Sequence, residues 1–280
     1  MPHASSSPPL SLEIAARSDP GLLRSLNEDS IATVNELGLL VLADGMGGYQ
    51  SGDVASSLVT HIIVEGLTRG LQGRPATASS DVAELVQTSV KRANRAIFLE
   101  GQQRAQRTNS TQDQAMGSTV ALLLFRNHHV TIAHVGDSRV YRLRANHLEL
   151  MTHDHSLLQE QIDQGILSAE AAATSHNRHL VTRGLGLQAE VEVSLVEDDV
   201  LPGDIYMACS DGLNDMVDNA DIERVLGALQ ANLPLAASQL VMIANDNGGE
   251  DNISVILAKA GPHSTPAAKK KGFFAWLFGR

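Results

Sequence analysis

Four aspartates stand at the ends of strongly apolar runs, where carboxylates are candidates for metal chemistry. They are Asp44 after residues 39–43, Asp137 after 132–136, Asp211 after 205–210, and Asp251 before 253–257. An isolated carboxylate in an apolar setting loses several kcal/mol of hydration, so aspartates carried by buried strands need partners or cations. If the four strand ends converge, divalent cations relieve the repulsion, and an all-oxygen ligand set selects Mg²⁺ or Mn²⁺ over Zn²⁺.

The pairs Asp44-Gly45 and Asp211-Gly212 have an alternative interpretation as tight turns, because Asp-Gly suits the backbone of hairpins. A single pair of this kind is typical of a turn. Four aspartates that each adjoin an apolar run favour one shared acidic site instead.

The sequence lacks the residues that other hydrolytic mechanisms need. A cysteine phosphatase requires an arginine six positions after its nucleophile, and six positions after Cys209 stands Asp215. We therefore expect Cys209 to be a buried core residue. No serine lies between two glycines in the nucleophile-elbow spacing, and residues 211–218 lack the glycine and alternating ligands of a calcium loop.

Two histidine pairs offer a zinc site as an alternative, His153 with His155 and His176 with His179. No cysteine or glutamate partners stand at metal-binding spacing beside them, so zinc is disfavoured. We expect His155 to shape the rim of the acidic site instead.

The elements that position these residues are predicted from apolar spacing. Short apolar stretches predict strands at residues 12–16, 30–34, 38–43, 119–125, 130–135, 139–143, 147–151, 191–196, 205–209 and 253–259. Helical spacing predicts helices at residues 55–63, 82–98, 222–229 and 235–244, and Asp81 with Glu84 marks a helix start. The polar segment 101–114 separates the second helix from the next strand. Because strands and helices do not alternate regularly, we predict an α+β fold with antiparallel sheets rather than a doubly wound parallel sheet.

Composition limits the class of protein. The 280 residues are 43% hydrophobic and 19% charged, which suits a globular core without disulfides. The formal net charge of −11 argues against nonspecific binding to nucleic acid, which needs clustered Lys and Arg. A single cysteine, no secretory signal and no apolar run near the roughly 20 residues of a membrane span predict a cytoplasmic protein.

An ordered set of short motifs covers residues 11–259 and resembles the metal-dependent Ser/Thr protein phosphatases of the PPM (PP2C-type) family in their bacterial form. The motifs are SDPGLLR (18–24), NEDS (27–30), ADGMGG (43–48) with Gly52, MGST (116–119), VGDSRVY (135–141), DHS (154–156), TRGLG (182–186), SDGL (210–213) and DNIS (251–254). The resemblance implies an antiparallel β-sandwich flanked by pairs of α-helices (αββα), with a binuclear metal site at one end.

The resemblance also implies which residues hold metal. Asp44 resembles the carboxylate that bridges two Mn²⁺ or Mg²⁺ ions, while Asp211 and Asp251 resemble ligands of the first ion. The backbone carbonyl of Gly45 is similar to a ligand of the second ion. Asp137 resembles the ligand of a third, weakly bound ion shared with Asp211. Asp44, Asp211 and Asp251 would thus form the catalytic set around a metal-activated water.

Three further positions match residues that surround the metals in the family. Glu28 and Asp29 would hold metal-bound waters, and Arg24 matches the arginine that binds the substrate phosphate. A planar guanidinium can grip two phosphate oxygens, a role that lysine fills less well. Without the motif, Arg24 has an alternative interpretation as a surface arginine beside a turn.

Two positions depart from the family pattern. Met46 stands where animal members carry a histidine proposed as the general acid, as is usual in bacterial members, so proton delivery to the leaving group is unassigned. Tyr49 stands where many bacterial relatives carry histidine, which affects substrate preference rather than metal chemistry. Tyr49 and His155 are therefore candidates for substrate specificity.

Composition along the chain divides it into three parts. Residues 1–9 resemble a disordered arm, residues 10–260 the phosphatase domain, and residues 261–280 a linker with a basic and aromatic tail. Residues 156–183 correspond to the flap, the variable segment beside the active site in the family. The alternative for this segment is a solvated loop with no special role.

The tail joins a basic run at residues 269–271 to aromatic side chains, which are Phe273, Phe274, Trp276 and Phe278. Three interpretations are open. The tail could lie at the inner face of the membrane, since lysines attract anionic lipid and aromatic rings favour the interface. It could also dock into a groove on a partner such as a cognate kinase, or fold back over the domain.

The sequence thus predicts a monomeric phosphoprotein phosphatase of signal transduction that removes phosphate from serine and threonine and opposes a bacterial Ser/Thr kinase. A second hypothesis is a catalytically idle member that binds phosphoproteins. The complete set of Arg24, Asp44, Asp137, Asp211 and Asp251 argues against it, because a binding module needs no metal set. A third is a phosphatase or phosphodiesterase of small molecules that uses the same metals.

Overall fold

A computed structural model of the chain describes residues 11–47, 51–72, 79–108, 116–168, 171 and 180–261. Residues 1–9, Tyr49, His176, His179 and the tail beyond Gly261 lie outside the described residues, as does part of the segment expected to form the flap. The expectations for these parts of the chain stay predictions.

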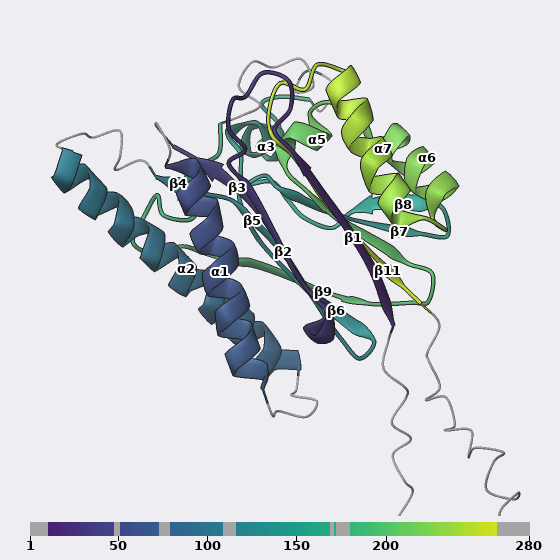
Figure 1. Ribbon diagram of the computed structural model, residues 1–280, viewed down its shortest axis with the longest axis horizontal. Coiled ribbons are helices and arrows are strands. Elements are labelled where there is room, and N and C mark those ends of the chain that lie inside the picture. Colours follow the sequence, from purple (N-terminus) through teal and green to yellow (C-terminus); the bar gives the residue numbers. More distant parts are fainter. Residues whose placement is uncertain are drawn as a thin grey trace, which may run out of the picture.

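Two antiparallel sheets form the centre of the fold (Figure 1). The first contains, in spatial order, β1 (Leu12–Asp19), β11 (Ile253–Ala260), β10 (Ile205–Cys209), β7 (Arg139–Arg144) and β8 (His147–Leu150). The second contains β2 (Asp29–Val34), β3 (Leu39–Met46), β5 (Val120–Arg126), β6 (His129–Val135) and β9 (Ser194–Asp199), and the short β4 (Gly117–Ser118) pairs with β3. The predicted α+β fold with antiparallel sheets is confirmed.

Helices cover the outer face of each sheet. The long helices α1 (Gly52–Leu71) and α2 (Ser79–Thr108) lie on the second sheet, while α6 (Asn219–Leu229) and α7 (Leu233–Asp246) lie on the first. The one-turn helix α5 (Asp211–Asn214) follows β10, and the short 3-10 helix η1 (Asn35–Leu37) joins β2 to β3. Among the described residues, no helix is long and apolar enough to cross a membrane.

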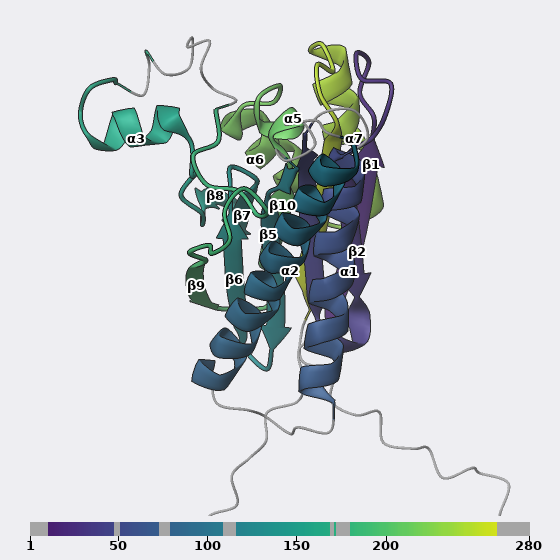
Figure 2. The same cartoon turned by 90° about the vertical axis from the view of Figure 1, so that its left-hand side faces the viewer.

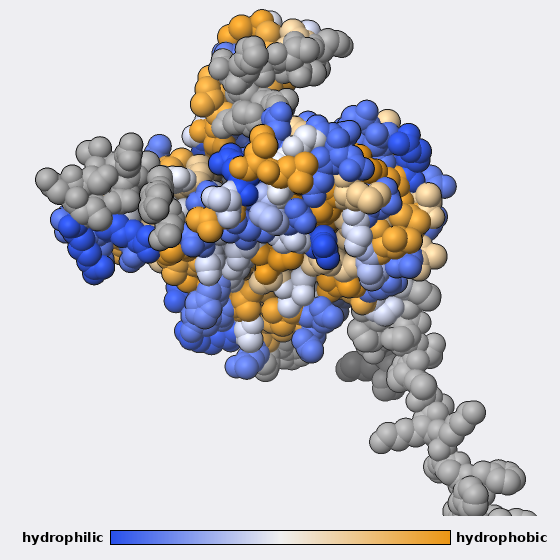
Figure 3. All heavy atoms as spheres, turned by 45° about the horizontal axis from the view of Figure 1, so that its top comes forward, coloured by the Kyte–Doolittle hydropathy of each residue, from blue (hydrophilic) through white to orange (hydrophobic). Residues whose placement is uncertain are grey.

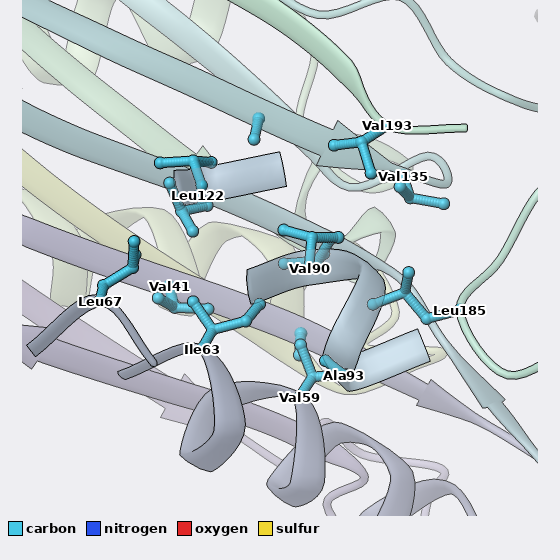
Figure 4. Packing of buried hydrophobic residues seen from close by; sticks show 14 of the residues in the cluster. Val41, Val59, Ile63, Leu67, Val90, Ala93, Leu122, Val135, Leu185 and Val193 are labelled. Atoms are coloured by element: carbon cyan, nitrogen blue, oxygen red, sulfur yellow. The ribbon is translucent and has the colours of Figure 1, made fainter. Parts of the chain in front are cut away.

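The central strands β3, β5, β6, β10 and β11 are largely apolar on both faces because they are buried on both faces. Along β3, Leu39, Val41 and Ala43 pack under α1 and α2, whereas Leu40 and Leu42 pack against the other sheet. This alternation follows from the period of two residues in a strand. Figure 4 shows the outer cluster, in which Val59, Ile63 and Leu67 of α1 meet Val41 and Leu122 of the sheet.

Several boundaries differ from the predictions, including those of α1, which spans Gly52–Leu71 rather than residues 55–63, and those of α2 and β9. Helix α2 begins at Ser79, before the expected start at Asp81, and continues through the polar residues to Thr108. An ion pair one helical turn apart, with Arg104 Nε 2.9 Å from Glu100 Oε1, supports this exposed extension. Strand β9 begins at Ser194 rather than at residue 191, since its pairing with β6 begins there.

The segment after β8, which includes the residues expected to form the flap, leaves the sandwich. Its described helix, α3 (Leu157–Asp163), stands off the end of the sheets (Figure 2). The helix begins after Ser156, whose side-chain oxygen accepts a hydrogen bond from the Gln159 amide at 3.2 Å. Two backbone hydrogen bonds, Leu157 N to Leu180 O and Thr182 N to His155 O, bring the described ends of the segment together.

Candidate active site

A cavity of about 490 Å³ opens at the end of the sandwich where β1, β3 and β10 finish and β11 begins. Its acidic lining residues are Glu28, Asp44, Asp137, Asp211, Asp215, Glu250 and Asp251. Arg24 contributes a basic side chain to the same wall. The four aspartates at the ends of apolar runs therefore surround one cavity, together with Glu28 and Arg24.

Strand register explains how the acidic residues reach this cavity. Asp44 lies near the end of β3, opposite Asp29 of β2 in the antiparallel ladder. Asp211 opens α5 immediately after β10, and Asp251 lies two residues before β11. Because β10 and β11 are neighbours and antiparallel, the end of one strand lies beside the start of the other. Asp137 occupies the turn between β6 and β7.

Thr119 fixes the backbone around Asp44. The sequence shows Thr119 as part of the MGST motif but does not show this contact. The Thr119 hydroxyl accepts a hydrogen bond from the Asp44 amide at 3.1 Å, and the Thr119 amide donates to the Asp44 carbonyl at 2.8 Å. The same hydroxyl lies 2.6 Å from Ser138 Oγ. Thr119 thus connects the strand that carries Asp44 with the turn that carries Asp137.

Gly45 lies where two other segments meet β3. A Cβ atom at this position would lie 2.0 Å from the Gly52 carbonyl oxygen and 2.7 Å from the Glu28 carbonyl oxygen. The Gly45 amide donates a hydrogen bond to the same Glu28 oxygen at 3.1 Å. A side chain at position 45 would therefore displace the segment at Glu28 or the start of α1.

Asn252 holds the loop between β1 and β2 against the start of β11. Its Oδ1 accepts a hydrogen bond from the Glu28 amide at 2.7 Å. Its Nδ2 donates to the carbonyls of Pro20 at 3.0 Å and Leu26 at 2.9 Å. One side chain therefore fixes both ends of the loop that contains Arg24, a function that sequence reasoning missed.

Arg24 reaches the acidic wall through Asp251. Its Nη2 lies 2.7 Å from Asp251 Oδ2, and 52% of the arginine side chain is exposed. The pair therefore places a guanidinium at the mouth of the cavity, open to a ligand from solvent.

Burial and mutual repulsion raise the pKa values of the carboxyl groups here. Burial, with the charges of Asp211 and Asp251, raises the pKa of Asp29 to about 7. Hydrogen bonds with Ser254 and Ser210 lower this pKa but do not offset the rise. Burial and the charges of Asp211 and Asp154 raise the pKa of Asp137 to about 8. Burial likewise raises the pKa of Asp44, and the neighbouring aspartates add to the shift. The ionised state of this cluster needs positive charge nearby.

The donor set fits hard divalent cations. All its candidate ligands are oxygen atoms, and Asp29 Oδ1 is buried without a hydrogen-bond partner while Oδ2 accepts from Ser210 Oγ at 2.8 Å. In the described part of the chain, no three His, Cys, Asp or Glu side chains converge into a ready set of metal ligands. The carboxylates line the wall of the cavity instead.

Asp215 is a further member of the acidic wall that sequence reasoning did not assign. It follows α5, one helical turn after Asp211, and lines the cavity. Its charge contributes to the raised pKa of Asp137. The spacing of Asp211 and Asp215 would have indicated a common side only once a helix at this point was recognised.

His155 lies behind the turn that carries Asp137. Its amide donates to the Gly136 carbonyl at 3.0 Å, and its Nδ1 accepts from the Gly136 amide at 3.1 Å. The ring stacks on His134 with 4.7 Å between centroids. Burial, together with His134 and Arg183, lowers the pKa of His155 to about 3, so the ring is neutral and acts as an acceptor.

His153 and Cys209, which were considered for zinc binding and for nucleophilic catalysis, lie in surroundings that suit neither role. His153 Nε2 lies 2.8 Å from Asp163 Oδ2 on the surface. Cys209 is buried, as predicted, and its thiol donates to Asn214 Oδ1 at 3.6 Å. Burial raises the pKa of this thiol to about 12, which disfavours a nucleophilic thiolate.

Comparison with known proteins identifies the class to which this fold and site belong. A family model described as "Protein phosphatase 2C" matches residues 24–240. The chain belongs to the protein phosphatase 2C (PPM) family.

Two curated relatives illustrate the range of similarity. The chain is 37% identical over 250 residues to the serine/threonine protein phosphatase PstP of Mycobacterium tuberculosis, covering 89% of this chain and 45% of PstP. It is 31% identical over 247 residues to the serine/threonine phosphatase stp of Listeria innocua, covering 87% of this chain and 94% of that protein. The chain thus spans less than half of PstP but nearly all of stp.

Solved structures share the fold. The crystal structure of M. tuberculosis PstP/Ppp has a TM-score of 0.78 and 35% identity over 90% of this chain and 99% of that chain. The catalytic domain of PstP in complex with two manganese ions has a TM-score of 0.76 and 34% identity, covering 90% and 100%. PppA of Pseudomonas aeruginosa, described as a regulatory component of T6SS, has a TM-score of 0.72 and 31% identity, covering 89% and 97%.

Proposed function

We propose that this protein hydrolyses phosphoserine and phosphothreonine esters in proteins, with two Mn²⁺ or Mg²⁺ ions as cofactors. The observation that carries the proposal is the single cavity that combines buried carboxylates of raised pKa with a guanidinium at its mouth. Carboxylates suit hard cations, and an arginine suits a phosphate dianion. Relatives named serine/threonine phosphatases, and the PstP catalytic domain with two manganese ions, support the same chemistry.

The proposed ligands come from four strand ends. Asp44 would bridge the two ions, Asp211 and Asp251 would bind the first, and the Gly45 carbonyl would bind the second. Asp137 with Asp211 would hold a third, weaker ion, and Glu28 and Asp29 would accept hydrogen bonds from water around the pair. When bound, two such ions lower the pKa of water and neutralise charge on the transferring phosphoryl group.

Arg24 binds the substrate phosphate in this proposal. Its pairing with Asp251 holds the guanidinium beside the acidic wall. The planar group can then present its remaining N–H groups to phosphate oxygens, which orients the phosphorus toward the interior of the cavity.

The partners of the reaction are phosphorylated proteins and the Ser/Thr kinase that modifies them. We place the protein as a monomer in the cytoplasm, with the flap at residues 156–183, Tyr49 and His155 influencing substrate choice. The basic and aromatic tail at residues 261–280 would hold the protein at the inner face of the membrane or on a partner. No role in nucleic-acid binding is expected from the acidic charge balance.

A panel of three substrates tests the proposal. Phosphate release is measured from a phosphothreonine peptide and the matching phosphotyrosine peptide, and p-nitrophenol release from bis(p-nitrophenyl) phosphate, each with Mn²⁺ and with EDTA. The proposal predicts Mn²⁺-dependent turnover with phosphothreonine preferred. Preference for the diester would indicate a phosphodiesterase, and binding of the phosphothreonine peptide without turnover would indicate a catalytically idle phosphoprotein binder.

A further inference from the structure

Three exposed leucines surround Arg24 in the loop between β1 and β2. Leu22, Leu23 and Leu26 have 65%, 71% and 49% of their surface exposed. We call these three residues the leucine lip. Single exposed leucines are common on proteins, but a cluster beside a functional cavity marks a place where another molecule binds. Figure 3 brings this end of the molecule forward and shows apolar side chains gathered next to hydrophilic ones.

The backbone beneath the leucine lip is fixed. The amides of Leu22 and Leu23 both donate to the Gly249 carbonyl, at 2.8 and 3.3 Å. The Leu26 carbonyl accepts from Asn252 Nδ2 at 2.9 Å. The loop therefore displays apolar side chains from an ordered backbone, so a ligand that contacts them loses little affinity to ordering the loop.

Leu22, Leu23 and Leu26 lie in the same loop as Arg24 and Glu28, which line the cavity. A Cβ atom at Gly249 would lie 2.9 Å from Leu22 Cγ, so Leu22 packs against the loop that carries Asp251. On the other side of the same loop, a Cβ at Gly248 would lie 3.7 Å from the sulfur of Met216, which lines the cavity. Apolar groups thus flank the Gly248-Gly249 turn on both sides.

We propose that the leucine lip binds an apolar side chain of the phosphoprotein substrate, within two residues of the phosphorylated one. The inference rests on the proposed function, since a phosphate held by Arg24 brings its flanking residues over Leu22, Leu23 and Leu26. Asp215 and Glu250 add acidic side chains to the cavity wall, and Met216 adds an apolar one. The leucine lip therefore selects substrates by the residues next to the phosphate.

The test uses two phosphothreonine peptides of equal length and charge. One has leucine at the two positions on each side of phosphothreonine, and the other has serine there. In the full chain with Mn²⁺, we expect kcat/KM to be about tenfold higher for the leucine peptide, the size of effect expected for burying part of a leucine. In the double variant Leu22→Ser, Leu23→Ser, the preference should fall below about threefold.

A matched control is Leu235→Ser, because Leu235 is 48% exposed in the first turn of α7. This is the opposite end of the helix from Asn245, which donates a hydrogen bond to Asp19 beside the loop. This variant should keep the tenfold preference. Equal kcat/KM for both peptides in the unmodified protein, or a preference that survives the double substitution, would overturn the inference.

Binding measurements separate this inference from the proposed function. Non-hydrolysable phosphonate versions of both peptides are titrated in the presence of Mn²⁺. A lower Kd for the leucine version that is lost in the double variant supports the leucine lip, even if no peptide is hydrolysed. Equal Kd values contradict it, whatever the turnover.

Discussion

Arg24 and Asp251 lie 227 positions apart in sequence and form an ion pair at 2.7 Å at the mouth of the acidic cavity. The pair joins the group proposed to bind phosphate to a carboxylate proposed to bind metal. Because both side chains are partly exposed, the pair contributes only about 0–1 kcal/mol to the free energy of unfolding. Its importance lies in orientation, since it holds the guanidinium toward the place where the phosphate would bind.

Replacing Arg24 should therefore reduce activity much more than stability. We expect Arg24→Ala to lower kcat/KM for a phosphothreonine peptide about a hundredfold. The kcat/KM of Arg24→Lys should stay below about a tenth of the value for the unmodified protein, because lysine lacks the planar fork. The melting temperature should change by no more than a few degrees. Arg224→Ala is the control, since Arg224 forms a surface ion pair of the same length with Asp221 on α6. Equal loss in both variants would contradict the assigned role.

Asp44→Asn separates catalysis from folding. The substitution removes a buried carboxyl group whose pKa is raised by burial and by four neighbouring aspartates. In EDTA at pH 8, the variant should unfold at an equal or higher temperature than the unmodified protein, because a repulsive charge is gone. Its turnover with Mn²⁺ should fall about a thousandfold, as expected when a metal bridge is lost. A variant that is both less stable and active would refute this account of Asp44.

The pH dependence of stability should have a definite sign in EDTA. The pKa values of Asp29 and Asp137 are raised to about 7 and about 8, against about 3.9 in the unfolded chain. The folded state therefore retains protons that the unfolded state has released, so the free energy of unfolding falls as pH rises through 7 and 8. His155 opposes this trend near pH 6.5, where the unfolded imidazole is still half protonated, because its pKa is lowered to about 3 only in the folded state. Above about pH 7.5 the ring is neutral in both states and no longer contributes.

Chemical denaturation between pH 6.5 and 8.5 measures this effect. With Mg²⁺ the decline should become smaller or reverse, because a cation favours the ionised carboxylates. The variant Asp137→Asn should show a shallower decline in EDTA. Stability that rises with pH in EDTA would show that the pKa values of these carboxyl groups are not raised.

Asn252 should be essential for the loop that carries Arg24. The variant Asn252→Ala removes hydrogen bonds to Glu28, Pro20 and Leu26, and it should lower the free energy of unfolding by about 2–3 kcal/mol. Hydrogen exchange should become faster in residues 20–28. Asn232→Ala, which removes an exposed cap of α7, should cost about 1 kcal/mol without changing exchange in that loop. Unchanged exchange in Asn252→Ala would contradict the proposed anchoring.

The strands and the convergence of the aspartates could be predicted from the sequence because both depend on local pattern. Residues 39–43 of β3 and residues 205–209 of β10 form unbroken apolar runs, since helices cover one face and the other sheet covers the second. Asp44 and Asp211 follow these runs directly, so the ends of neighbouring strands bring them to one cavity.

The supporting residues could not be predicted in the same way because their contacts are distant in sequence. Asn252 binds the Glu28 amide across 224 positions, and Thr119 binds Asp44 across 75. The motifs contain both residues and their partners Glu28 and Asp44, but do not show which residue bonds to which. The end of α2 was missed for another reason. Residues 101–108 are mostly polar, and the pair Arg104–Glu100, rather than an apolar stripe, accompanies the helix there.

The most direct test of the central claim is phosphate release from a phosphothreonine peptide by the unmodified protein and by Asp211→Asn, each with Mn²⁺, with EDTA, and with Mn²⁺ restored. Asp211 lines the cavity and is proposed to hold the first ion. The account predicts release that needs Mn²⁺, returns when Mn²⁺ is restored, and is lost in the variant while the fold is retained. Release that persists in EDTA, or a variant with unchanged turnover at saturating Mn²⁺, would contradict it.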